Sequence, residues 1–130
     1  MGKKVCVVGA GYWGKNHIRT LSKLGVLKGV VEFNPKILYS LSKEYPNVSF
    51  YENIDLALKE DYDGFTVATP SESHFNLSKK IISAGKHVLI EKPMALSIED
   101  SKELLLLAEK FNVNLMVGHL LLFHPAIIKI

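Results

Sequence analysis

The sequence has only one cysteine and no apolar stretch long enough to span a membrane. Because Cys6 is the only cysteine among 130 residues, the chain cannot form an internal disulfide. Cys6 lies within a short apolar run, so we expect a small buried hydrophobic residue, which suits a reducing cytoplasm. The apolar stretch of residues 115–128 is too short for a bilayer and contains His119, His124 and Pro125. We therefore expect a cytoplasmic protein without a membrane segment.

Strong charge of one sign is also missing. The net charge is +3, from 16 Lys and Arg against 13 Asp and Glu, and the lysines are scattered along the chain. This pattern argues against nucleic acid as a partner, although a mild positive charge would help to attract an anionic cofactor. The five histidines form no close pair on one predicted helix face, so we expect no zinc site. A hydrophobic fraction of 48% is ordinary for one globular domain.

A glycine-rich turn follows the first short apolar run. Residues 5–8 are apolar, the sequence Gly-Ala-Gly-Tyr-Trp-Gly follows, and a helix-like segment continues to residue 24. Strand, glycine turn and helix in this order are typical of a dinucleotide-binding fingerprint. Gly9 would permit a tight turn, Gly11 the approach of backbone N–H groups to a pyrophosphate, and Gly14 close packing of the helix. The pyrophosphate would then lie at the helix N-terminus.

An acidic residue at the end of the second predicted strand supports the fingerprint. Residues 27–31 read as a buried strand, and Glu32 follows Gly9 by 23 residues. The acidic residue that binds the adenosine ribose is expected roughly 20 residues after the fingerprint. A carboxylate there would repel a 2′-phosphate, so we expect NAD rather than NADP, with Lys36 as the residue that argues for NADP. The alternative is that Glu32 is simply a solvated residue at a strand end.

The rest of the chain alternates short apolar runs with amphipathic stretches. Further strands are expected at residues 48–51, 65–68, 87–90 and 114–117. Helices are expected at residues 35–44, 54–59, 73–84 and 98–111, with Asn34 and Ser97 as N-caps and Gly85 as a C-terminal signal. Strands that are apolar throughout and separated by helices predict a three-layer α/β Rossmann fold. Its doubly wound parallel sheet would have about six strands in the order 3-2-1-4-5-6.

Unusual polar residues follow several of the predicted strands. In such a sheet, ligands bind beyond the carboxyl ends of the strands, where the strand order reverses. The segments that would lie there are residues 9–14, Glu32, residues 69–74, residues 91–93 and residues 118–119. Ser71 or Ser73 would in addition cap the helix that follows.

Three motifs stand out along the chain: the glycine turn of residues 9–14, Ala68-Thr69-Pro70 followed by His74, and Gly-Lys-His-Val-Leu-Ile-Glu-Lys-Pro at residues 85–93. Together they resemble the N-terminal nicotinamide-binding domains of the Gfo/Idh/MocA oxidoreductases. The resemblance covers essentially the whole chain. Residues 12–16 and 118–126 are most similar to the branch that oxidises C3 of UDP-N-acetylated hexosamines or their uronates.

The resemblance implies a role for each motif. Lys92 would lie beside the nicotinamide and the substrate as a catalytic residue that steers a hydroxyl or relays its proton. The cofactor-binding residues it implies are Gly9, Gly11, Tyr12, Trp13, Gly14, Glu32, Thr69, Pro70, Ser71, His74, Glu91, Lys92 and His119. His74 would act as a hydrogen-bonding or orienting group, and a cis peptide often precedes the proline at position 93. The alternatives are a loop lysine paired with Glu91 and a structural histidine at position 119, while His17 and His87 are expected to be structural.

The resemblance also implies a longer protein. Family members continue with a second α/β domain that binds the sugar and supplies a further catalytic histidine. We expect residues 1–123 to form the NAD(P)-binding domain and residues 124–130 to begin a helix that leads to that domain. This chain alone would bind NAD and turn over little or nothing. Two alternatives remain open, a stand-alone nucleotide-binding or sensing module and a structural remnant that binds nothing, and self-association into a homo-oligomer is open as well.

Overall fold

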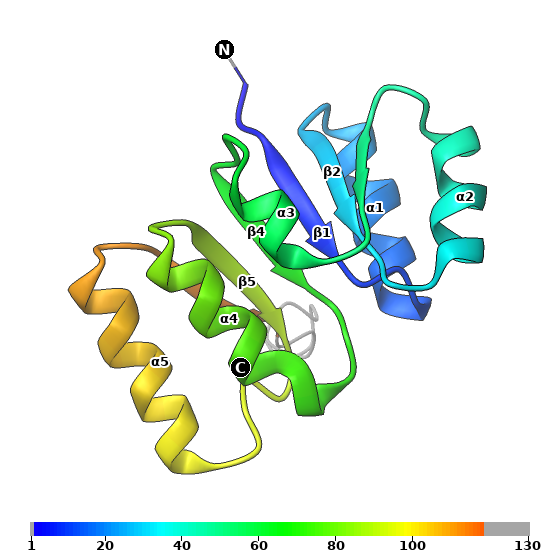
Figure 1. Ribbon diagram of the computed structural model, residues 1–130. Coiled ribbons are helices and arrows are strands. Elements are labelled where there is room, and N and C mark those ends of the chain that lie inside the picture. Colours follow the sequence, from blue (N-terminus) through cyan, green and yellow to red (C-terminus); the bar gives the residue numbers. More distant parts are fainter. Residues whose placement is uncertain (1, 119–130) are drawn as a thin grey trace, which may run out of the picture.

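Six parallel strands form one sheet with helices on both faces (Figure 1). The computed structural model describes residues 2–118. The strands are β1 (Val5–Val8), β2 (Leu27–Val31), β3 (Ser49–Tyr51), β4 (Gly64–Val67), β5 (His87–Glu91) and β6 (Leu115–Gly118). The helices are α1 (Tyr12–Lys23), α2 (Pro35–Glu44), α3 (Ile54–Leu58), α4 (His74–Ser83) and α5 (Ile98–Lys110), with a short 3-10 helix, η1 (Ser71–Ser73). The sheet order β3-β2-β1-β4-β5-β6 confirms the predicted Rossmann fold.

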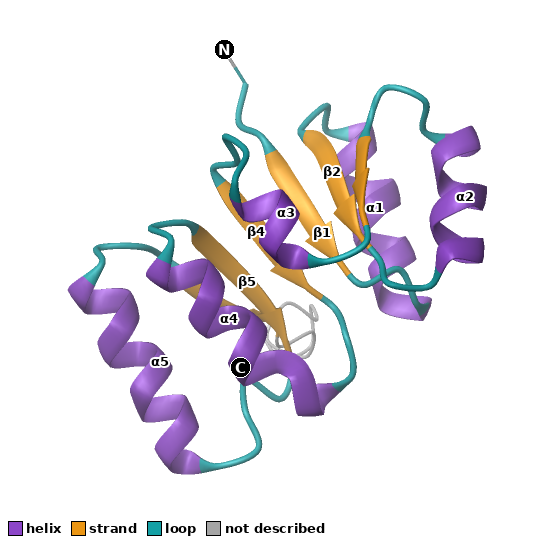
Figure 2. Ribbon diagram, viewed as in Figure 1, coloured by secondary structure: helices purple, strands orange, loops and turns teal. Residues whose placement is uncertain are grey.

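The helices form two layers, one on each face of the sheet (Figure 2). Helices α1 and α2 follow β1 and β2 and cover one face, whereas α3, α4 and α5 cover the other. Strand β1 pairs in parallel with β2 on one side and with β4 on the other. The loops after β1 and β4 therefore leave the sheet in opposite directions, which is where such folds bind ligands.

Both faces of the central strands are buried, which explains why they are apolar throughout. Val7 packs with Ile18 of α1 in one core cluster. Its neighbour Cys6 points to the other face and packs with Phe65 and Ile81. Cys6 is completely buried, which confirms its predicted role as a small hydrophobic residue.

The predicted helix caps are present at three positions. The side chain of Asn34 accepts a hydrogen bond from the backbone N–H of Lys36, 3.0 Å away, at the start of α2. Ser97 accepts one from the backbone N–H of Asp100 at 3.1 Å, at the start of α5. Gly85 has a φ of +77° after α4, as expected for a residue that ends a helix.

The start of α4 differs from the prediction. Neither Ser71 nor Ser73 caps this helix, which begins at His74 after η1. The hydroxyl oxygen of Ser73 instead lies 2.6 Å from the hydroxyl oxygen of Thr69 and 2.7 Å from the carbonyl oxygen of Pro70. The serine thus stabilises the turn after β4 rather than the helix.

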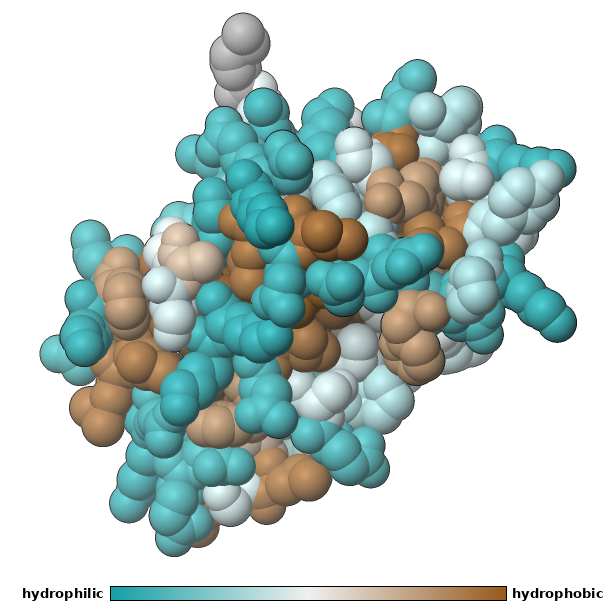
Figure 3. Space-filling model, in the orientation of Figure 1, coloured by the Kyte–Doolittle hydropathy of each residue, from teal (hydrophilic) through white to brown (hydrophobic). Residues whose placement is uncertain are grey.

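Some apolar side chains reach the surface over α5. This helix buries Leu104 and Ala108, while Leu105 and Leu106 are 52% and 66% exposed. Figure 3 shows hydrophobic residues, in brown, at the left of the molecule, where α5 lies in Figure 1. Within residues 2–118, no helix has the length and apolar character needed to cross a membrane.

Candidate functional site

The glycine turn after β1 has the geometry that its sequence predicts. Gly9 has a φ of +98°, a conformation that side chains rarely adopt. A Cβ on Gly14 would stand only 1.8 Å from the carbonyl oxygen of Gly9, so α1 packs directly on the turn. A Cβ on Gly11, by contrast, would meet nothing within 4 Å. No protein atom requires glycine at position 11, and the space in front of its backbone is open.

Glu32 is buried at the end of β2 and connects that strand to the glycine turn. The residue is only 7% exposed. One carboxylate oxygen accepts a hydrogen bond from the backbone N–H of Ala10, and the other accepts one from that of Asn34, both at 2.9 Å. The interpretation of Glu32 as a solvated strand-end residue is therefore wrong. Each oxygen keeps a lone pair with which to accept a further hydrogen bond, such as that of a ribose hydroxyl.

A cavity of about 700 Å³ opens beside Glu32 at the carboxyl ends of the strands. The glycine turn, the end of β2 and the loops after β3 and β4 form its walls. The predicted site residues that line it are Gly9, Gly11, Glu32, Thr69 and Pro70. One wall of the cavity thus carries a buried carboxylate. Another carries exposed backbone at the N-terminus of α1, which has partial positive charge. Such a pair of walls suits a group with hydroxyls at one end and phosphate at the other.

A smaller cavity of about 150 Å³ lies at the carboxyl ends of β4 and β5. It is lined by Trp13, Ala68, Thr69, Ser71, His74, Glu91 and Lys92. Six of these seven residues were predicted as site residues, and the fold brings them together from three separate segments. Tyr12 lines neither cavity; its ring is 79% exposed and packs edge-on against Trp13, with the ring centroids 5.3 Å apart. His119 and the predicted helix of residues 124–130 lie outside the described residues.

His74 connects the loops after β4 and β5. It is 1% exposed, with its Nδ1 at 2.6 Å from the carbonyl oxygen of Pro93 and its Nε2 at 2.7 Å from that of Thr69. Carbonyl oxygens only accept, so both contacts are hydrogen bonds only when both ring nitrogens carry hydrogen. The peptide bond between Lys92 and Pro93 is cis, as the family resemblance implied.

A second histidine makes a contact that the sequence did not reveal. His17 of α1 was expected to be structural, and its Nε2 lies 2.5 Å from a carboxylate oxygen of Glu91. Among the ion pairs of residues 2–118, Glu91 pairs with His17 and not with Lys92. The alternative in which Lys92 is a loop lysine paired with Glu91 is therefore not supported. One signal was available: His17 follows Gly14 by three residues, so both lie on the helix face that packs toward the sheet.

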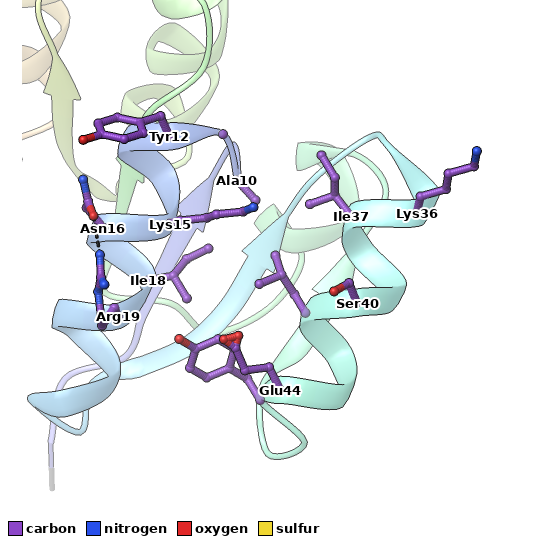
Figure 4. A pocket seen from close by; sticks show the side chains of 13 residues that line it. Ala10, Tyr12, Lys15, Asn16, Ile18, Arg19, Lys36, Ile37, Ser40 and Glu44 are labelled. Carbon is purple, nitrogen blue, oxygen red and sulfur yellow. Dashed lines mark hydrogen bonds between the residues drawn. The ribbon is translucent and has the colours of Figure 1, made fainter.

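A wider hollow of about 840 Å³ lies between α1 and α2, on the other side of the glycine turn (Figure 4). Ile18 and Ile37 line its apolar part, and Lys15 extends into it from α1. Lys36 extends away from α2 toward the outside, and Arg19 is hydrogen-bonded to Asn16 on its own helix. This hollow lies between two helices rather than at the strand ends, and of the predicted site residues only Gly11 and Tyr12 line it.

The titratable groups with shifted pKa values lie in the core. Burial raises the pKa of the Cys6 thiol, and burial together with a hydrogen bond to Tyr51 raises the pKa of Tyr62. Neither group lines the two cavities at the strand ends. Within the part of the chain that the structure describes, no three His, Cys, Asp or Glu side chains are placed to hold a metal ion.

Comparison with known proteins agrees with this geometry. Residues 3–119 match the family model of the Gfo/Idh/MocA oxidoreductases, an oxidoreductase family with an NAD-binding Rossmann fold. The chain belongs to this family. The buried carboxylate after β2 and the glycine turn after β1 are therefore parts of an NAD-binding domain.

Relatives within the family include enzymes that act on sugars. The chain is 31% identical to UDP-N-acetylglucosamine 3-dehydrogenase of Acidithiobacillus ferrooxidans, across 93% of this chain and 38% of that protein. It is 35% identical to glucose-6-phosphate 3-dehydrogenase of Bacillus subtilis, across 89% of this chain and 33% of that protein. The crystal structure of the WlbA dehydrogenase from Bordetella pertussis, in complex with NADH and UDP-GlcNAcA, matches with a TM-score of 0.89 and 27% identity, across 97% of this chain and 39% of that one. The chain thus spans little more than a third of these relatives.

Proposed function

We propose that this NAD-binding domain serves an enzyme that transfers a hydride between the nicotinamide of NAD and the carbon of a sugar hydroxyl. The observation that carries the proposal is the buried carboxylate of Glu32. It holds the glycine turn through Ala10 while facing the cavity at the carboxyl ends of β1, β2 and β4. The activity would require the additional part that the relatives have, because this chain corresponds to only 38% of the first of them.

The residues around the cavity beside Glu32 fit the adenosine and pyrophosphate part of NAD. Glu32 would accept hydrogen bonds from the ribose hydroxyls, since both of its oxygens keep accepting capacity. The backbone N–H groups at the start of α1 would bind the pyrophosphate, and the open space at Gly11 allows a phosphate to approach them. Thr69 and Pro70 would line the opposite wall.

Glu32 also favours NAD over NADP. A 2′-phosphate on the adenosine ribose would lie against a carboxylate that is almost completely buried. Lys36, the residue that could offset this repulsion, does not line the cavity beside Glu32 and extends away from α2 in Figure 4. Lys80 does line the cavity, but its ammonium is paired with Asp55 at 3.1 Å.

The smaller cavity would receive the nicotinamide end. NAD, when bound, supplies the hydride acceptor. Lys92 would orient the substrate hydroxyl and, as the neutral amine, take up its proton on the terminal nitrogen Nζ. Trp13, Thr69 and Ser71 would line the nicotinamide and its ribose, and Glu91 and His74 would support the loop that carries Lys92.

The position oxidised on the sugar would be C3. The two relatives named above are both 3-dehydrogenases, one of a nucleotide sugar and the other of a sugar phosphate. The match to the WlbA structure, a complex with UDP-GlcNAcA, favours a UDP-N-acetylated hexosamine or its uronate as the substrate.

Titration with NADH, followed by nicotinamide fluorescence, tests the binding part of this proposal. We expect saturable binding of NADH and weaker binding of NADPH. No binding of NADH at millimolar concentration would refute it and favour the remnant that binds nothing. To separate an enzyme from a sensing module, the gene would be sequenced beyond codon 130, where an in-frame second domain favours the enzyme.

A further inference from the structure

Two histidines from different helices hold the residues on either side of Lys92. Glu91, directly before it, is bound by His17 of α1. Pro93, directly after it, has its carbonyl oxygen within 2.6 Å of His74, the first residue of α4. Helices α1 and α4 lie on opposite faces of the sheet, so the two contacts approach the Lys92 segment from two sides (Figure 2).

Both contacts are shielded from water, which makes them costly to break. The Glu91 side chain is 12% exposed and that of His17 is 23% exposed. Gly118 of β6 leaves room for the carboxylate, because a Cβ there would come within 3.2 Å of a Glu91 oxygen. His74 is almost completely buried and has a hydrogen-bonding partner at each ring nitrogen. Loss of a partner inside the protein leaves a desolvated polar group, which is far less favourable than at the surface.

The segment between the two contacts needs such support. Lys92 lines the smaller cavity but belongs to no strand or helix, since β5 ends at Glu91 and α5 begins only at Ile98. A lysine side chain has several rotatable bonds and loses much conformational freedom when it is held in one position. A fixed backbone beneath it reduces the number of positions its ammonium can reach, which is what a site for directed proton transfer requires.

We propose that His17 and His74 are positioning residues that hold the backbone of Lys92 in place at the nicotinamide end of the site. Neither histidine needs to touch the cofactor or the substrate for this role. His17 acts through Glu91, and His74 acts through Pro93. The helix that carries His17 also carries Gly14 of the glycine turn, so the turn and Lys92 are held by one rigid element. The functional meaning of this arrangement rests on the role proposed above for Lys92.

Backbone 15N relaxation of the chain tests the contact without any cofactor. In the unmodified chain we expect the amide of Lys92 to have an order parameter near 0.85, the value of a rigid backbone. His17→Leu removes the donor to Glu91 and should lower the Lys92 order parameter below about 0.6. His17→Gln keeps an N–H at a similar place and should restore it. Equal values in the unmodified chain and in His17→Leu, or no restoration by His17→Gln, would overturn the proposal.

His74 is tested by a parallel pair of variants. His74→Gln retains N–H donors and His74→Leu does not, so only the second should mobilise Lys92. Because His74 is buried, His74→Leu risks misfolding, and Glu91→Gln provides a second variant that weakens the His17 contact instead. His87→Leu is the matched control, since His87 begins the same strand and accepts a hydrogen bond from the backbone N–H of Asn114 at 2.9 Å. It should leave the Lys92 amide unchanged; a loss of order there equal to that of His17→Leu would overturn the proposal.

Ligand affinities connect the two histidines to the cofactor. ADP-ribose contains the adenosine and pyrophosphate of NADH but no nicotinamide. For His17→Leu we expect the Kd for NADH to rise about fivefold, or about 1 kcal/mol, and the Kd for ADP-ribose to change less than about twofold. Equal losses for both ligands would indicate a general structural effect and would overturn the positioning role. Failure of the unmodified chain to bind either ligand would refute the proposed function instead, while the relaxation data would still decide whether the histidines hold Lys92.

Discussion

Gly14 packs against Gly9 so closely that a Cβ on Gly14 would stand 1.8 Å from the carbonyl oxygen of Gly9. Gly14→Ala must therefore displace either α1 or the turn after β1. We expect it to lower the free energy of unfolding by about 1–3 kcal/mol or more, as overpacked cores do. Urea denaturation followed by circular dichroism measures this change.

Gly11→Ala provides the comparison within the same turn. A Cβ there meets no protein atom, and the φ of −78° suits alanine. The free energy of unfolding should change by less than about 1 kcal/mol, while NADH binding should weaken because the methyl group enters the space in front of the backbone amides. If Gly11→Ala destabilised the fold as much as Gly14→Ala and left binding intact, the division of roles between these glycines would be wrong.

Replacement of Glu32 by Ala should weaken the binding of NAD by about 1–3 kcal/mol, because it removes the acceptor proposed for the ribose hydroxyls. NADP should lose less affinity, since the substitution also removes a negative charge that opposes its 2′-phosphate. The substitution leaves the backbone N–H of Ala10 without its 2.9 Å partner, so the folded fraction must be measured alongside. Glu44→Ala, at the exposed end of α2, controls for the change in net charge. Parallel losses for NAD and NADP would contradict the ribose contact.

Ser78 offers a stability test away from the site. Its hydroxyl is completely buried in α4 and has no hydrogen-bonding partner among the described residues. A buried hydroxyl without a partner loses its hydration and gains nothing in return. Ser78→Ala should therefore raise the free energy of unfolding by about 1 kcal/mol, measurable as a higher urea midpoint at an unchanged m-value. Ser101→Ala on α5, which is only partly buried, should have a smaller effect.

Lys92→Ala separates catalysis from cofactor binding in a protein that includes the second domain. If Lys92 takes up the proton of the substrate hydroxyl, kcat should fall by about 100-fold or more, the usual contribution of a positioned acid or base. The Kd for NADH should rise by no more than the roughly fivefold expected for His17→Leu, because Glu32 and the glycine turn remain in place. Lys86→Ala, at the half-buried residue directly before β5, is the matched control. Loss of NADH affinity alone would mean that Lys92 binds the cofactor rather than the proton.

The fold and much of the geometry of the candidate site could be predicted because their signals are local. The apolar run before Gly9, the spacing to Glu32 and the cap at Asn34 each reflect a constraint within one turn or one strand-helix unit. The contact of His17 with Glu91 could not be predicted in the same way, because it joins residues 74 positions apart in sequence. Its partners are set by how α1 packs on the sheet.

The predicted capping of α4 by Ser71 or Ser73 was wrong for a different reason. A serine before a helix favours capping, but the hydroxyl of Ser73 has closer partners in Thr69 and Pro70. The turn after β4 decides which of these competing hydrogen bonds forms, and a local sequence pattern does not contain that turn. The burial of Glu32 was likewise invisible in the sequence, because it depends on the backbone N–H groups of Ala10 and Asn34 converging on the carboxylate.

Alkaline pH should destabilise the domain through Cys6 and Tyr62. Burial raises the pKa of both groups above their ordinary values of 9.0 and 10.0, so the folded chain keeps protons that the unfolded chain releases. Their contribution to the free energy of unfolding should therefore be complete below about pH 8 and fall as the pH rises past these ordinary values, by at most about 1.4 kcal/mol per pH unit for each group. Urea titrations between pH 7 and about pH 10.5 measure this slope. Cys6→Ala and Tyr62→Phe should each flatten it, whatever their effect on stability at neutral pH. A slope that persists in the double variant would show that other groups cause the alkaline loss.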